Sequence, residues 1–180
     1  MCKRSEFFNR ALNGNWSEKK DRLVKLPEDD TKIFSLYVNL IYTGEIPGQT
    51  GYSKMMPDEF QKHIMAIVKL YILAEKLQDK QAKNVALTTV HAKIALNLSP
   101  DRLPNAEIVE LMYRNTPKGS LGRRLMVHLW NDNNTKDILG KSEGICKEFF
   151  VDLARSLHIN RPNIRNVACS VQSNVYKEKL

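Results

Sequence analysis

The sequence is poor in cysteine and contains no long hydrophobic run. Its 180 residues include only three cysteines, Cys2, Cys146 and Cys169, which are too few and too widely spaced for a disulfide framework. No apolar stretch approaches the roughly 20 residues of a membrane-spanning helix, and no apolar signal segment follows Met1. We therefore expect an intracellular protein, in the cytoplasm or nucleus, with reduced thiols and no membrane partner.

Basic charge is present but is not concentrated anywhere. The chain has 28 Lys and Arg against 20 Asp and Glu, a net charge of +8, and residues 1–98 and 99–180 contribute +4 each. The densest basic groups are pairs such as Arg123-Arg124. A nucleic-acid binder more often shows a basic stripe with interleaved aromatic residues. We therefore expect a mildly basic, solvated surface and no direct binding of nucleic acid.

Motifs for catalysis and for cofactor or metal binding are also missing. Gly140-Lys141-Ser142 resembles part of a nucleotide-binding loop, but Thr135 stands where that loop requires another glycine. Ser142 is better interpreted as a helix cap, and the acidic run at 28–30 as the start of the next helix. The four histidines are dispersed. We predict no catalytic, cofactor or metal site; an enzyme whose site assembles from distant residues is the least favoured alternative.

Apolar residues recur at helical spacing through the first half of the chain. The spacing predicts helices over 5–12, 32–42, 63–77 and 82–95, while Arg22–Leu26 is a strand candidate that Pro27 ends. Residues 44–60 are rich in Gly and Pro and indicate a long loop. The helix over 32–42 has the densest apolar cluster and is expected at the centre of the core. The predicted core residues are Phe8, Leu26, Phe34, Tyr37, Leu40, Tyr42, Leu70 and Leu77.

The second half is predicted to contain only helices. A domain boundary is placed near Asn97–Pro100, giving a first domain over 1–98 and an all-α extension over 99–180. Three helices are expected there, capped by Asn105, Ser120 and Ser142. The apolar residues expected on the last two are Leu121, Leu125 and Leu129, and then Ile145, Phe149, Phe150, Leu153 and Leu157. The tail from Asn160 is expected to be partly ordered. The predicted fold class is α+β and mainly helical.

The order of these segments resembles the BTB/POZ domain. The match is strongest over residues 5–46 and continues into the next helix. Its residues are Ser5-x-x-Phe8, Ala11-Leu12, Leu26-Pro27, Tyr42-Thr43-Gly44 and Lys69-Leu70-Tyr71-x-x-Ala74-Glu75-x-Leu77. Further on, Tyr113–Ser120 followed by Arg123-Arg124-Leu125 is similar to the C-terminal region of fungal BTB proteins. The resemblance implies an N-terminally incomplete BTB/POZ core, which lacks the family's first β-hairpin and helix, and a helical extension.

The resemblance implies a non-catalytic protein-interaction module without cofactors. Family members form homodimers, and some are adaptors that present substrates to cullin-type ubiquitin ligases. Because no counterpart of the first β-hairpin and helix precedes Cys2, we expect much of the usual dimer interface to be missing and Met1 to be an uncertain start.

The family's cullin-contacting pattern has an apolar residue two positions before a glutamate. In this chain only Pro57-Asp58-Glu59 has that form, in the loop after Gly44, and proline is a poor apolar anchor. These three residues are the predicted partner-binding residues, with a cullin contact disfavoured. The alternative to an interaction module is a nucleus-associated transcription or chromatin factor that binds nucleic acid indirectly.

Overall fold

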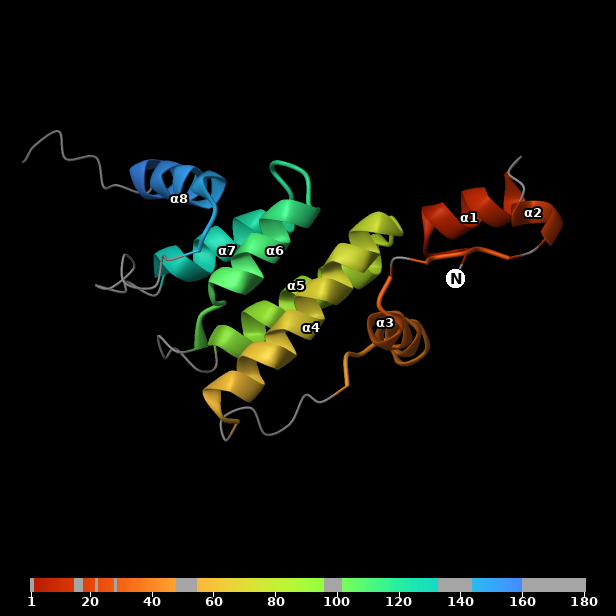
Figure 1. The fold of residues 1–180 in the computed structure, drawn as a ribbon, viewed down its shortest axis with the longest axis horizontal. Helices are drawn as coiled ribbons and strands as arrows, with labels where there is room; N and C mark the ends of the chain where they lie inside the picture. Colours follow the sequence, from red (N-terminus) through yellow and green to blue (C-terminus); the bar gives the residue numbers. More distant parts are fainter. Residues whose placement is uncertain are drawn as a thin grey trace, which may run out of the picture.

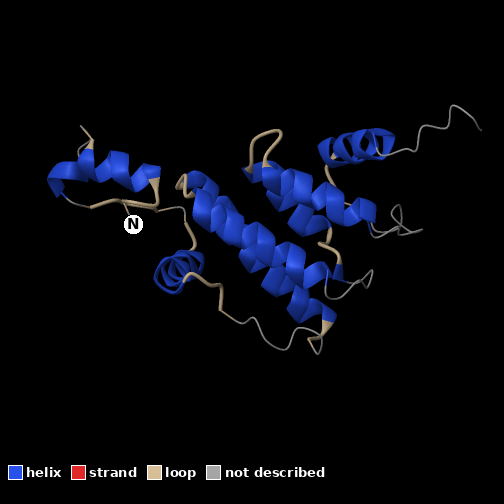
Figure 2. Cartoon of the chain, turned by 180° about the vertical axis from the view of Figure 1, so that it is seen from behind, coloured by secondary structure: helices blue, strands red, loops and turns tan. Residues whose placement is uncertain are grey.

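The described part of the chain is built from helices joined by loops (Figures 1 and 2). The structure, a computed structural model, describes residues 2–14, 18–21, 23–27, 29–47, 55–95, 102–132 and 144–159. Within these ranges there are eight helices and no strand. The helices are α1 (Glu6–Asn13), α2 (Glu18–Asp21), α3 (Thr31–Thr43), α4 (Pro57–Lys76), α5 (Lys80–Ala95), α6 (Ala106–Asn115), α7 (Leu121–Asp132) and α8 (Lys147–Ile159).

A long helical hairpin, α4 and α5, forms the middle of the molecule (Figure 1). On one side α3 packs against α4 and is seen nearly end-on, so it crosses the hairpin steeply. On the other side α6 packs against α4 and α7 against α5, and α8 lies outermost against α7. None of the helices in the described ranges combines the length and hydrophobicity that crossing a membrane requires.

Side-chain caps explain where several helices begin. Ser5 Oγ accepts a hydrogen bond from Phe8 N–H at the start of α1 (3.2 Å), and Asp30 Oδ1 accepts one from Lys32 N–H at α3 (2.8 Å). Asn105 Oδ1 accepts one from Ile108 N–H at α6 (3.0 Å). These oxygens satisfy N–H groups that the first turn leaves without a partner. The mainly helical class is confirmed, and α1, α3, α5 and α6 begin within one or two residues of the predicted positions.

Two predictions for the first half are wrong. The predicted strand Arg22–Leu26 is a loop over its described residues, Leu23–Leu26. Val24 and Leu26 nevertheless pack against the core, as alternate residues of a strand would. A strand needs a neighbour for its backbone hydrogen bonds, and the described residues supply none. The predicted loop over 44–60 is also too long, since α4 begins at Pro57. Proline is accepted there because the first position of a helix needs no backbone N–H. The short helix α2 was not predicted.

The last two helices differ from their predicted patterns. α8 begins at Lys147, after Ile145, and the predicted cap Ser142 lies outside the described residues, as do Gly140-Lys141 and the tail from Asn160. Phe149 and Leu153 are buried, but Leu157 is 45% exposed. On α7 the predicted Leu121 is exposed and Leu125 half-buried. The residues that α7 buries are Gly122, Arg123, Met126, Val127, Leu129 and Trp130.

The core is centred on the α4–α5 hairpin rather than on α3. α3 buries three residues, whereas α4 buries eight. Among the predicted core residues, those that are buried are Phe8, Tyr37, Leu40, Leu70 and Leu77; Leu26 and Phe34 are half-buried at its edge. Tyr42 is 83% exposed, so its assignment to the core is wrong. It follows Leu40 by two residues, which turns it about 200° around the helix and away from α4.

The hydrophobic core continues across the predicted domain boundary. Leu103, Ile108 and Met126 belong to the same buried cluster as Leu70 and Tyr71. On α7, Gly122 donates its N–H to the Tyr71 hydroxyl (3.1 Å), and a Cβ at this position would lie 2.6 Å from the Tyr71 ring. Such a close approach requires glycine. Residues 97–100 lie outside the described residues, so the division into 1–98 and 99–180 stays a prediction.

Asp79 holds α1, α3 and the hairpin together. Its side chain is fully buried in the turn between α4 and α5. One oxygen accepts a hydrogen bond from Ala82 N–H at the start of α5 (2.9 Å), and the other accepts one from the Tyr37 hydroxyl of α3 (3.0 Å). The second oxygen also lies 3.4 Å from Arg4 Nε, just before α1. Burial, and next the negative charge of Asp79, raise the pKa of Tyr37 above its ordinary value.

We expect Asp79→Ala to lower the free energy of unfolding by on the order of 3 kcal/mol, because it removes a helix cap and leaves a buried hydroxyl and a cation without their acceptor. The matched control is Asp29→Ala, which removes a more exposed ion pair with Lys76 (2.8 Å) and should cost less than about 1 kcal/mol. Urea denaturation followed by circular dichroism measures both. Equal losses in the two variants would contradict the role given to Asp79.

The hairpin also buries a lysine. Lys93 on α5 is 4% exposed, and burial lowers the pKa of its amine to about 8. Burial, and next the charge of Lys93, also lower the pKa of His63 on α4. Because a charged amine is costly to bury, the folded protein releases the Lys93 proton at a lower pH than the unfolded chain does.

We therefore expect the free energy of unfolding to rise with pH between about 8 and 10, where the unfolded chain binds more protons than the folded protein. Lys93→Met keeps the length of the side chain without its charge, so it should stabilise the protein at neutral pH and flatten this rise. Urea denaturation across this range, below the full ionisation of the tyrosines, measures both effects. A variant that keeps the wild-type slope would refute the assignment.

Candidate functional site

The predicted partner-binding residues lie in the first turn of α4. Pro57, Asp58 and Glu59 are all exposed, and Met56 before them is exposed as well. The two carboxylates make no ion pair or hydrogen bond with another described residue, and they favour the positive end of the helix dipole. Their role in partner binding stays a prediction.

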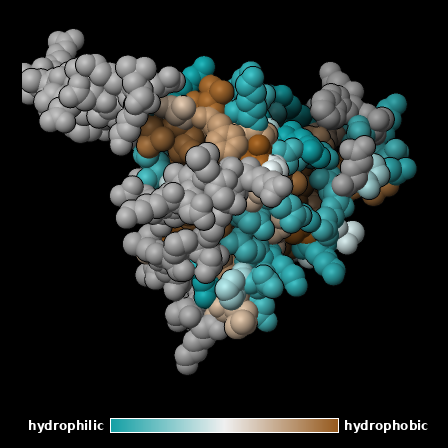
Figure 3. Space-filling view, turned by 60° about the vertical axis from the view of Figure 1, so that its left-hand side comes forward, coloured by the Kyte–Doolittle hydropathy of each residue, from teal (hydrophilic) through white to brown (hydrophobic). Residues whose placement is uncertain are grey.

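A groove of about 770 Å³ lies between α7 and α8. It was not predicted from the sequence. Its walls come from the α6–α7 turn, from α7 and from α8, and its residues are Lys118, Gly119, Arg123, Arg124, Val127, His128, Lys147, Glu148, Val151, Asp152, Arg155 and Ser156. Figure 3 brings the α8 end forward and shows apolar side chains at the surface among polar ones; the large apolar residues of α8 that are exposed are Val151 and Leu157.

Arg123 is the buried member of the Arg123-Arg124 pair, and it completes the end of α6. The carbonyl of Tyr113 would normally accept the N–H of residue 117, but Pro117 has none. The Arg123 guanidinium donates to that carbonyl and to the carbonyl of Thr116 instead. It also lies 4.6 Å above the Tyr113 ring and 3.1 Å from Glu148 of α8. A cation at this end of a helix matches the helix dipole.

Phe149 and Asp152 of α8 make further contacts with α6 and α7. The Phe149 ring is fully buried and meets Tyr113 and Trp130 edge-to-face, with centroid distances of 5.7 and 5.4 Å. Asp152 accepts a hydrogen bond from the Tyr113 hydroxyl (3.0 Å). Burial, and next this hydrogen bond, raise the pKa of Tyr113 above its ordinary value. The contacts fix the separation of α7 and α8 and therefore the width of the groove.

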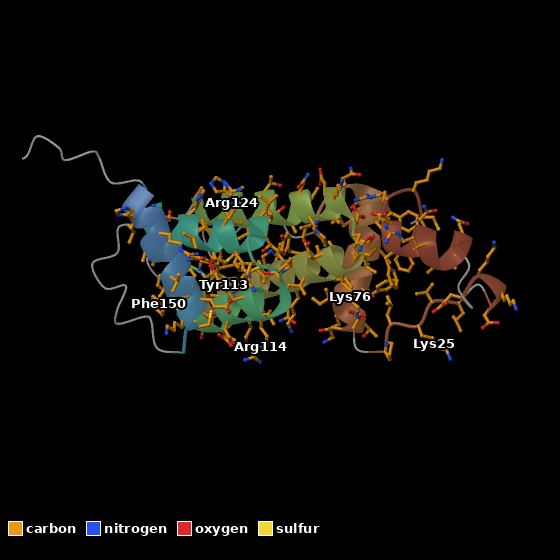
Figure 4. All side chains as sticks on the ribbon, turned by 90° about the horizontal axis from the view of Figure 1, so that it is seen from above. Lys25, Lys76, Tyr113, Arg114, Arg124 and Phe150 are labelled. Atoms are coloured by element: carbon orange, nitrogen blue, oxygen red, sulfur yellow. The ribbon has the colours of Figure 1, made fainter. Side chains whose placement is uncertain are left out.

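The groove has an excess of positive charge. Both acids among its described residues are engaged within the protein, Glu148 with Arg123 and Asp152 with Tyr113 and Arg155. The cations that make no ion pair with any described residue are Lys118, Arg124 and Lys147. Positive charge on the walls of a groove attracts anionic ligands. Figure 4 shows that Arg124 lies on one side of the helices and Arg114, paired with Glu110, on the other.

The groove contains the residue types of a serine-hydrolase triad, but they are not arranged as one. Ser156, His128 and Asp152 all line it. Asp152 is occupied by Tyr113 and Arg155, and no hydrogen bond joins His128 to Ser156 or to Asp152. A triad requires the base to bond both the nucleophile and the acid. Nor do the described residues contain a group of three or more His, Cys, Asp or Glu side chains suited to a metal ion.

Local signals of the groove exist in the sequence, although the prediction missed them. On α8, Lys147, Val151 and Arg155 recur every fourth residue and so share one helical face. Thr116-Pro117, followed by Arg123, marks a helix end that needs an outside donor. The distance between α7 and α8 has no such signal, because it is set by contacts between residues far apart in the sequence.

Comparison with known proteins does not assign the chain to a family. No protein-family model, no curated protein and no solved structure matches it. The BTB/POZ resemblance rests on the sequence residues quoted above.

We expect Arg123→Ala to lower the free energy of unfolding by about 3–5 kcal/mol, because a buried, paired cation is lost and two helix-end carbonyls lose their donor. Arg124→Ala, one residue further on, should change it by less than about 0.5 kcal/mol, because its side chain is exposed. Thermal and urea denaturation distinguish the two. Similar losses for both arginines would contradict the division of roles.

Proposed function

We propose that the protein is a non-catalytic protein-interaction module and that a partner protein binds in the groove between α7 and α8. The observation that carries this proposal is the combination of an apolar wall with cations that the described residues leave unpaired. Val151, which is 39% exposed, offers a contact for a partner's side chain, and Arg124 and Lys147 flank the same groove. Interfaces join an apolar centre to a polar rim in this way.

The BTB/POZ resemblance supports the same class of function. Its motifs fall on α1, on the loop at Leu26-Pro27, on α3 and α4, and on the α6–α7 turn with the start of α7, and the family acts by binding proteins rather than by catalysis. We propose that the chain is a BTB/POZ-like protein of the cytoplasm or nucleus with a helical extension. A partner that pairs a strand of its own with Leu23–Leu26 fits this proposal, and a second copy of this chain is one such partner. An adaptor role in a ubiquitin ligase is a narrower form of this proposal, and it requires a cullin contact at Pro57–Glu59.

The proposal is tested by display selection on the immobilised protein with a library of protein segments that is unbiased in charge. Selected segments should bind the wild type and lose affinity by about tenfold or more for Val151→Glu, which places a charge on the apolar wall. Lys25→Glu is the control, because Lys25 is exposed at the far end of the molecule from α8 (Figure 4). Melting curves of each variant verify folding.

Two outcomes would overturn the proposal. In one, the selected segments bind Val151→Glu as tightly as they bind the wild type. In the other, repeated selection enriches no segment. Loss of affinity confined to the Val151 variant supports the groove as the binding surface.

A further inference from the structure

The cations of the groove come from three separate elements and face one space. Lys118 lies in the α6–α7 turn, Arg124 on α7 and Lys147 on α8, and all three line the groove. Arg155, one turn beyond Val151 on α8, shares its charge with Asp152 at 3.6 Å. Among the described residues, the acids of the groove are therefore already paired, and these cations are left to attract the negative charge of a ligand. Complementary charge of this kind fixes the register and the identity of a bound chain.

The apolar surface in the same groove is small and aliphatic. Val127 of α7 is buried at its base, and Val151 of α8 is partly exposed beside it. The two valines come from the two helices that form the walls of the groove, and Val151, which is 39% exposed, offers most of the apolar contact. Such a surface suits one aliphatic side chain, and the surrounding cations suit acidic residues on either side of that side chain.

We infer that the groove binds an acidic segment of a partner protein, in which a leucine or similar aliphatic residue is flanked by Asp or Glu. This inference rests on the proposed function and adds the chemical class of the ligand. The aliphatic side chain contacts Val127 and Val151. The flanking carboxylates pair with Arg124 on α7 and with Lys147 on α8, and Lys118 extends the positive field along the α6–α7 turn.

Nucleic acid fits the same groove less well. None of the described residues that line it is Phe, Tyr or Trp, so its described walls offer no aromatic side chain on which a base could stack. Glu148 and Asp152, paired with Arg123 and Arg155, also line the groove and interrupt its row of unpaired cations, so it offers no continuous basic surface for a run of phosphates. The separate carboxylates of a peptide can avoid these two acids, whereas evenly spaced phosphates cannot.

The test uses three defined probes and fluorescence anisotropy at several salt concentrations. The first is a peptide of about nine residues with a central Leu and two Glu on each side, the second has Gln in place of every Glu, and the third is a short DNA duplex. We expect the Glu peptide to bind at least about tenfold more tightly than the Gln peptide. The double variant Arg124→Glu, Lys147→Glu should lose this preference, while Lys25→Glu should keep it.

A charge swap provides the sharpest readout. It adds a fourth probe, a peptide with Lys in place of each Glu. The double variant should bind this Lys peptide more tightly than the wild type does, because the attraction is restored with opposite signs. Unchanged folding of the variants is verified by their melting curves.

Equal affinity for the Glu and Gln peptides would overturn the inference, as would DNA binding that exceeds peptide binding and depends on Arg124. A different result would contradict the proposed function itself: display selection that yields no segment whose binding depends on Val151. Selected segments that depend on Val151 but carry no excess of acidic residues would leave the module standing and contradict only the acidic ligand.

Discussion

A single buried guanidinium, that of Arg123, determines how the last three helices are arranged. Pro117 removes the N–H that the end of α6 needs, and Arg123 reaches from α7 to supply donors in its place. The same group pairs with Glu148 and so holds α8. A buried charge is tolerated only when its partners are complete, so the α6–α7 turn and α8 must keep their positions for Arg123 to stay paired.

The division of labour between two adjacent arginines follows from helix geometry. Successive residues point about 100° apart on α7, so Arg123 can enter the protein while Arg124 faces solvent. One arginine stabilises the walls of the groove, and the other is free to meet a ligand. Glu148 and Asp152 take part in holding the walls, which leaves the outer cations unbalanced within the described residues. The positive groove is therefore a consequence of how its walls are held.

Helices and their caps could be predicted because their causes are local. Asp30 and Asn105 lie at predicted caps, and Ser5 at the predicted start of a helix; each accepts a hydrogen bond from a backbone N–H two or three residues away. The errors concern contacts made across the fold. Tyr42 has the polarity of a core residue but faces away from α4, and Leu23–Leu26 alternate like a strand without a described partner. The sequence predicted that both Arg123 and Arg124 lie on a solvated surface. Arg123 is buried because α6 packs against α7, and no local pattern in the sequence indicates that contact.

The central claim, that ligands bind between α7 and α8, is tested most directly by nuclear magnetic resonance of the labelled 180-residue chain. Spectra of backbone amides and valine methyls would be recorded as the Leu-centred Glu peptide is added. The account predicts that the largest shifts occur at the methyls of Val127 and Val151 and at the amides around Arg124 and Lys147. Shifts concentrated on α1–α3 or at Pro57–Glu59, with the two valines unchanged, would contradict it.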